Sequence, residues 1–168
     1  DGKLNSVPPP STDRSLKGLR FERVPGGQCL RDENKPFYKF RKTPKESYPD
    51  GTNQEEIDAI LKHLAKRLKD PETQNDSIGI VTFNQKQRVA IEEQLSDSSD
   101  PDIQRAWSEG VGGETIFVKN LETVQGSERD VILFSVAFSK NLKGELPLNF
   151  GPLTIAGGER RLNVAITR

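Results

Sequence analysis

The stretch SIGIVTFNQKQRVAIEEQL, residues 77–95, decides the fold. Its first seven residues are mostly apolar and are bounded by turn-forming residues, which predicts a buried strand over 77–83. Asn84 can cap a helix, and the residues after it predict a helix over 85–95. Backbone amides at a strand-to-helix junction point toward a ligand, so we expect a ligand site at this junction.

The sequence before this stretch predicts an amphipathic helix over 52–69, where apolar residues recur at 3.6-residue spacing. Thr52 and Glu55 have the spacing of a capping box, which would satisfy two amides at the start of the helix. Asp70 followed by Pro71 predicts that the helix ends there.

The sequence after this stretch predicts two more strands, over 115–119 and 131–137, and helices over 103–107 and 160–168. Because 131–137 is almost continuously apolar, we expect this strand to be covered on both faces. The order of strands and helices predicts an α/β layer domain with a mainly parallel central sheet. Ligands of such domains bind at the carboxyl ends of the strands.

The amino-terminal part of the chain is more polar. Residues 1–16 contain three consecutive prolines and predict a linker or surface arm, which leaves 17–168 as the domain. A short half-exposed strand is expected over 18–24. The segment 35–41, KPFYKFR, interleaves basic and aromatic residues as nucleic-acid-binding segments do, although we prefer a loop fixed to the domain by its rings.

Composition sets broad limits on the function. With 168 residues the chain is one domain, too short for a complete two-domain motor, and its net charge of zero gives no sign of a nucleic-acid surface. A single cysteine, Cys29, excludes an internal disulfide, and we expect no protein-held metal and a reducing, intracellular location. No signal peptide or membrane-spanning run is visible. The chain lacks Met and stops inside a predicted helix, so we expect a piece of a longer protein.

The first candidate ligand loop follows the strand at 77–83. Phe83 could stack on a base, and Gln85 and Gln87 could bond to a base or a phosphate. The alternative is that Phe83 belongs to the core and Asn84 is an ordinary helix cap.

The second candidate loop spans 120–130, between two apolar strands. Gly126 would let a backbone approach a ligand closely, Glu128 could hold a ribose hydroxyl, and Thr123 and Gln125 could touch a phosphate. A hairpin or crossover turn with solvated charges explains the same residues.

The third candidate region is the glycine-led helix start at 157–168, which carries Arg160, Arg161 and Arg168. The planar guanidinium makes paired, charge-assisted bonds to phosphate, although any one of these arginines could instead form a surface salt bridge. No GxxxxGK[ST] phosphate loop and no nucleophile–base pair accompany them, so the chain holds no self-sufficient catalytic site.

Taken in this order, the three regions resemble a known family. GIVTFNQKQ resembles helicase motif IV, ETVQGSERDVILFS resembles motif V, and GGERRLNVAITR resembles motif VI. From about Leu19 to Arg168 the chain is similar to the second RecA-like domain of superfamily 1 helicases, in the branch of the nonsense-mediated-decay RNA helicases and related bacterial DNA helicases. The resemblance implies a RecA-like three-layer α/β domain of the P-loop NTPase class that lacks the Walker A half.

The resemblance also implies roles for individual residues. Arg168 matches the arginine finger that reaches the γ-phosphate, and Arg161 matches an arginine that braces the site. Gln125, Gly126 and Glu128 match the motif V loop between nucleotide and nucleic acid. Phe83 and Gln85 join these three as predicted nucleotide contacts. The predicted nucleic-acid contacts are Asn84, Thr123 and Val124.

One segment departs from the family pattern. Related helicases often carry Asn-Arg-x-Glu before motif IV, and here the comparable stretch is NQEE, residues 53–56. Gln54 stands where the family has a second phosphate-contacting arginine, which leaves that second contact open. The same stretch is also explained as the start of the helix.

The resemblance implies the carboxyl-side motor domain of an ATP-dependent helicase or translocase. An upstream RecA-like domain of the same chain would hold most of the ATP and Mg²⁺, and single-stranded DNA is preferred to RNA as the track. The chain alone is expected to be inactive, and the bacterial resemblance implies a cytoplasmic location. The alternatives are a nonenzymatic RecA-like module that binds nucleic acid or a partner, and the motor part of a helicase that also carries a nuclease.

Overall fold

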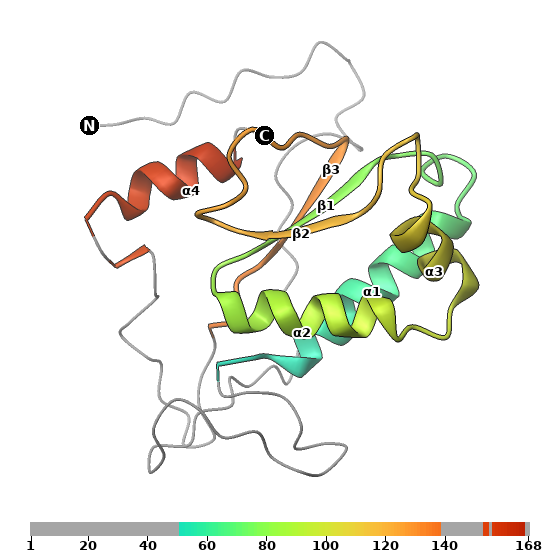
Figure 1. The fold of residues 1–168 in the computed structure, drawn as a ribbon, viewed down its shortest axis with the longest axis horizontal. Helices are drawn as coiled ribbons and strands as arrows, with labels where there is room; N and C mark the ends of the chain where they lie inside the picture. Colours follow the sequence, from blue (N-terminus) through green and yellow to red (C-terminus); the bar gives the residue numbers. More distant parts are fainter. Residues whose placement is uncertain (1–50, 139–152, 155, 167–168) are drawn as a thin grey trace.

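The computed structural model describes residues 51–138, 153–154 and 156–166, drawn in colour in Figure 1. The predicted arm at 1–16, the strand at 18–24, the segment at 35–41 and Arg168 lie outside these residues. Within the described ranges, no helix has the length and apolar character needed to cross a bilayer.

Three strands form a parallel sheet in the order β2-β1-β3, with β1 at Ile78–Thr82, β2 at Phe117–Asn120 and β3 at Val131–Ser135. Thr82 lies in register with Asn120 on one side and Ser135 on the other. All three strands therefore end side by side, and we call this line the carboxyl edge. The parallel sheet predicted from the sequence is confirmed.

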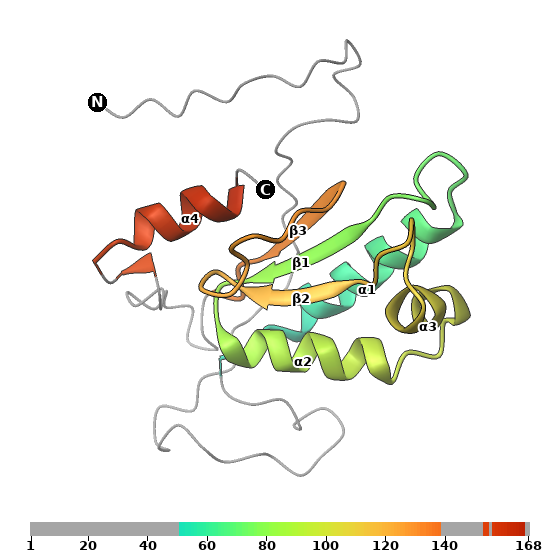
Figure 2. The same ribbon diagram turned by 45° about the horizontal axis from the view of Figure 1, so that its top comes forward.

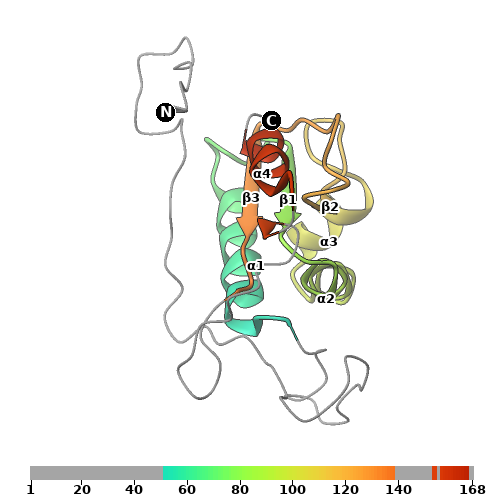
Figure 3. The same cartoon turned by 90° about the vertical axis from the view of Figure 1, so that its left-hand side faces the viewer.

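Helices cover both faces of the sheet (Figures 1 and 2). On one face lie α1 at Gln54–Lys69, α2 at Gln85–Ser96 and α3 at Pro101–Ser108. On the other face lies α4 at Gly158–Ile166. Figure 3 shows α1 on the β3 side of the first face and α2 on the β2 side. The three-layer α/β architecture is confirmed.

Alternation along the strands divides the core into two clusters. Ile78 and Ile80 pack with the apolar faces of α1, α2 and α3, whereas Val81 and Phe83 pack on the α4 side with Leu162. All five residues of β1 are buried. The prediction that β3 is covered on both faces is confirmed, because Leu133 joins one cluster and Ile132 and Phe134 the other.

The start of α1 differs from its prediction. The cap is Asn53, whose side-chain oxygen accepts from the backbone N–H of Glu56 at 3.2 Å. The expected capping box of Thr52 and Glu55 is wrong, because the helix begins one residue later than that box requires. Thr52 is instead fully buried and Glu55 is exposed. The predicted end at Asp70 and the predicted cap of α2 by Asn84 are confirmed.

Candidate functional site

The carboxyl edge gathers the loops that the sequence marked as ligand-binding. The loop after β1 leads into α2, and the loop after β2 turns back across the α4 face to the start of β3 (Figure 1). Asn120 joins the two loops, because its side-chain amide donates to the Gln85 side-chain oxygen at 3.0 Å. The structure thus brings together at one edge the two loops whose sequences resemble motifs IV and V, and we call them the motif IV loop and the motif V loop for that resemblance.

In the motif IV loop, Phe83 and Asn84 hold the loop in place: Phe83 packs in the core and Asn84 caps α2. Phe83 is 7% exposed within the α4-side core, and its N–H donates to the Ser135 carbonyl. Asn84 accepts from the N–H of Gln87 at 2.8 Å and donates its amide to the Gly51 carbonyl at 3.1 Å. Gln85 is exposed, and its side-chain oxygen accepts from Asn120 and from Arg88.

Gln87 does not face a ligand, as the sequence suggested. Its side chain is fully buried. Its amide oxygen accepts from the N–H of Asn53 at 2.8 Å, and its amide nitrogen donates to the Asn53 carbonyl at 3.2 Å and to the Ser135 hydroxyl at 3.1 Å. The prediction that Gln87 contacts a base or phosphate is therefore wrong, because all of these polar atoms are used inside the fold.

In the motif V loop, the predicted contact residues divide into buried and exposed. The side chain of Val124 is fully buried, whereas Thr123, Gln125, Gly126 and Glu128 are exposed. The Thr123 hydroxyl bonds to the Asn120 side chain at 2.9 Å. Gly126 has a φ of +78°, so the loop needs glycine there for its backbone conformation.

Glu56 holds the turn that follows β3. Its carboxylate accepts from the N–H groups of Val136 at 2.8 Å and Ala137 at 2.7 Å. Burial raises the pKa of Glu56 above its ordinary value, and these two bonds and one to the Ser135 hydroxyl oppose that rise. Ala137 has a φ of +62°, a conformation that residues other than glycine seldom adopt.

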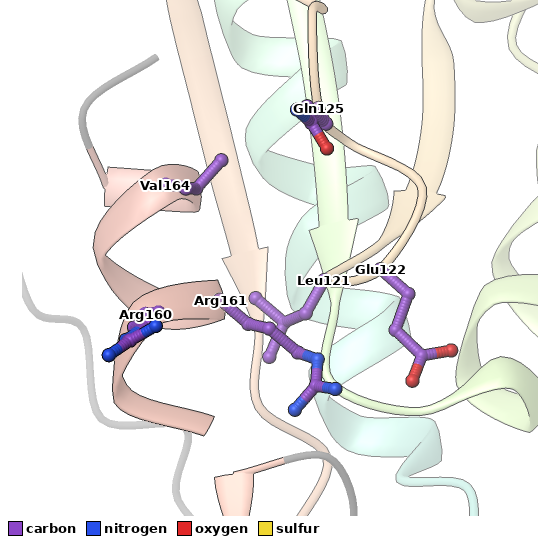
Figure 4. Close-up of a pocket in the computed structure, with 6 residues that line it drawn as sticks. All are labelled: Leu121, Glu122, Gln125, Arg160, Arg161 and Val164. Carbon is purple, nitrogen blue, oxygen red and sulfur yellow. The ribbon is translucent and has the colours of Figure 1, made fainter. Parts of the chain in front are cut away.

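A hollow of about 380 Å³ lies between the motif V loop and α4 (Figure 4). The residues that line it are Leu121, Glu122, Gln125, Arg160, Arg161 and Val164. The Arg161 side chain extends from α4 across the strands toward Glu122, whereas the Arg160 guanidinium points away from the other lining residues. The structure thus brings Arg161 and Gln125, two predicted site residues, to one hollow.

The hollow carries groups that can bind a phosphate, beside the carboxylate of Glu122. A guanidinium on one wall and a side-chain amide on another are groups that bind phosphate oxygens. Across the part of the chain that the structure describes, no three His, Cys, Asp or Glu side chains gather into a metal-ligand group.

Comparison with known proteins agrees with the α/β fold. The AAA domain family matches residues 23–168, most of the chain. The chain belongs to the AAA domain family. This AAA domain is 40% identical over 112 residues to a protein of Mycoplasma genitalium described as an uncharacterized ATP-dependent helicase. It is 35% identical over 120 residues to the homologue in Mycoplasma pneumoniae.

These alignments cover 62% and 69% of the AAA domain chain but only 10% of each helicase. The matched part is thus about a tenth of the relatives' length. No solved structure matches the chain.

Sequence reasoning about the AAA domain missed the residues that support the edge, namely the buried Asn53 and Gln87 and the half-buried Glu56. A signal for Gln87 existed. It occupies the same face of α2 as the buried residues Ala90 and Ile91, so helical spacing alone predicts that it points inward. No comparable signal marked Glu56, because its partners Val136 and Ala137 lie 80 residues away in the sequence.

Proposed function

We propose that this AAA domain is the carboxyl-side motor domain of an ATP-dependent helicase or translocase. The observation that carries the proposal is the hollow that Arg161 of motif VI shares with Gln125 and Glu122 of motif V. The names of the two Mycoplasma relatives support it. The domain would complete an ATP site together with an upstream RecA-like domain of the same chain.

Several residues of the chain have proposed roles at the nucleotide. Arg161 would bind phosphate from the wall of the hollow, and Arg168 would act as the arginine finger at the γ-phosphate. Gln85, Gln125, Gly126 and Glu128 would contact the nucleotide from exposed positions on the two loops. When bound, Mg²⁺ supplies charge neutralisation at the phosphates.

Phe83 has a different proposed role from that of these exposed residues. Because its ring is almost fully covered, its share in nucleotide binding would be to support the loop rather than to stack.

Single-stranded nucleic acid, preferably DNA, is the proposed track. Thr123 is exposed on the motif V loop and Asn84 lies at the start of α2, so both are near the carboxyl edge. At Val124 only the backbone is available, because the side chain is core. Helix starts and loop amides are common phosphate contacts, which is consistent with a backbone-tracking mode.

The test is ATP hydrolysis, with and without single-stranded DNA or RNA, by the chain alone and by the chain joined to the upstream sequence of its natural polypeptide. The chain alone is expected to be inactive, and the longer protein to be stimulated by DNA. Arg168→Ala should bind ATP but lose about 1,000-fold in turnover. Arg105→Ala, on α3, is the matched control and should leave turnover unchanged.

Two results contradict the proposal. If the longer protein binds nucleic acid without hydrolysing ATP, the domain is a nonenzymatic binding module. If Arg168→Ala turns over normally while the wild type is active, the finger has been assigned to the wrong arginine.

A further inference from the structure

A network of hydrogen bonds lies at the carboxyl edge, buried around Gln87 and Ser135 and partly exposed where Glu56 meets the turn after β3. Gln87 of α2 bonds to both backbone groups of Asn53, the cap of α1. The same Gln87 amide bonds to the hydroxyl of Ser135, the last residue of β3. Ser135 in turn bonds to Glu56 of α1, which holds the N–H groups of Val136 and Ala137. One network thus connects two helix starts, a strand end and a turn.

Burying the polar side chains of this network has a free-energy cost. Gln87 and Ser135 are both 0% exposed, and burial of polar groups has a free-energy cost that hydrogen bonding only offsets. An apolar side chain at position 87 would remove the acceptor of the Asn53 N–H and the donor to the Ser135 hydroxyl, so the amide at this position serves these partners specifically. Buried polar groups differ from apolar ones in fixing a particular geometry, because each bond needs its partner at a set distance and angle.

The element that the network holds in place is the turn at 136–137. Val136 is 41% exposed and is the one large apolar residue among the described residues that is exposed. Ala137 keeps a left-handed conformation, which is unfavourable for alanine and persists only where the surroundings enforce it. The turn follows β3 at the carboxyl edge, where α/β domains bind their ligands.

We propose that Gln87 and Glu56 are positioning residues, which hold the turn at 136–137 and the motif IV loop in one fixed arrangement for nucleotide turnover. The two residues act through Ser135 and the turn rather than by touching a ligand. The effect on turnover rests on the proposed ATPase function. The effect on the turn does not, since it follows from the hydrogen bonds of this chain alone.

The first measurement is hydrogen exchange at the Val136 and Ala137 amides in the 168-residue chain. Glu56→Gln keeps one acceptor oxygen and loses the other, so exchange at these amides should accelerate by about tenfold. Gln87→Leu should accelerate exchange at the same amides without changing that of Ile80, in the middle of β1. Gln94→Leu, seven residues later on the same helix, is the matched control and should change neither.

The second measurement is steady-state ATP hydrolysis by the longer natural polypeptide. Gln87→Leu should lower kcat by roughly tenfold and leave KM for ATP within about twofold, because the buried Gln87 side chain itself does not touch ATP. If Gln87→Leu fails to fold, Ser135→Ala takes its place, because it removes the two bonds that the Ser135 hydroxyl makes with Gln87 and Glu56, and we expect an effect of the same kind. Thermal unfolding of each variant separates lost positioning from lost stability.

The outcomes distinguish this proposal from the proposed function. Faster exchange at the turn together with an inactive wild type supports the positioning of the turn and contradicts the ATPase function. Unchanged exchange in Glu56→Gln and Gln87→Leu overturns the positioning proposal, whatever the activity. Faster exchange with an unchanged kcat in an active protein overturns its catalytic consequence.

Discussion

The carboxylate of Asp130 accepts two hydrogen bonds from Ser77, one from the backbone N–H at 2.9 Å and one from the hydroxyl at 2.7 Å. The backbone N–H of Asp130 donates back to the Ser77 hydroxyl at 3.0 Å. Ser77 precedes β1 and Asp130 precedes β3, so this pair aligns the starts of two neighbouring strands. The final acidic residue of the motif V sequence is therefore a structural clamp at the edge opposite the ligand loops.

The clamp should contribute measurably to stability. Ser77→Ala removes the hydroxyl from two of its three bonds and should lower the free energy of unfolding by about 1 kcal/mol. Urea unfolding of the 168-residue chain measures this change. Ser108→Ala, which removes one exposed bond at the end of α3, should change it by less than about 0.5 kcal/mol. Equal effects of the two substitutions would argue against a clamp.

The same pair predicts a dependence on pH. The Ser77 hydroxyl, followed by the Ser77 N–H, holds the pKa of Asp130 below its ordinary 3.8. The folded state therefore binds this proton less readily than the unfolded state, and the resulting stability is present above pH 3.8 and is lost as the pH falls through the folded pKa. Asp130→Asn should lose stability at pH 6 and approach the wild type below pH 3.8. Urea midpoints across this range test it, and a constant gap between the two proteins would refute it.

The two neighbouring arginines of α4 should differ in function. Arg161 reaches into the hollow toward Glu122, whereas the Arg160 guanidinium points away. In the longer polypeptide, Arg161→Ala should therefore weaken nucleotide binding or turnover by roughly 10- to 100-fold, the range expected for loss of one or two charge-assisted bonds. Arg160→Ala should change either by less than about threefold. The reverse order would show that α4 presents its other side to the nucleotide.

At Gly158, the first residue of α4, there is no room for a side chain. A Cβ at Gly158 would lie 2.3 Å from the Leu153 carbonyl oxygen, so Gly158→Ala must displace the helix or the backbone before it. We expect a loss of about 1–3 kcal/mol in the free energy of unfolding and weaker nucleotide binding, because Arg161 moves with the helix.

Gly113→Ala is the control for the Gly158→Ala substitution. Gly113 has a φ of +85° and no neighbour within 4 Å of a Cβ. This variant should lose stability through its backbone conformation alone and bind nucleotide as before.

Local sequence patterns predicted most of the elements that support the site. Apolar spacing predicted α1 and α2, and a short apolar run predicted β1. Each of these patterns depends only on residues that are close together in the sequence. The cap of α1 was misplaced by one residue, since Thr52 and Asn53 are both common caps and the spacing of Thr52 to Glu55 favoured the first, whereas in the structure Asn53 accepts from the N–H of Glu56.

The supporting contacts of the site lay beyond local patterns. Phe83 and Val124 both lie in polar loops of the kind that bind ligands, yet the side chain of each packs in the core on the α4 side. Glu56 carried only the signal of a helix start, and its contact with the turn after β3 depends on how α1 packs on the sheet. Residue type and order thus predicted which loops meet, but not which side chains in them are buried.

The strand order has a consequence for synthesis. β1 is the central strand yet the first of the three to leave the ribosome, and its partners β2 and β3 end only at Asn120 and Ser135. In the folded domain all five residues of β1 are buried. Until residue 135 has emerged, the backbone N–H and C=O groups along at least one side of β1 have no partner strand. Such an edge is a template for pairing with other chains. A nascent chain stalled between α3 and β3 therefore presents an open edge of β1 to other chains.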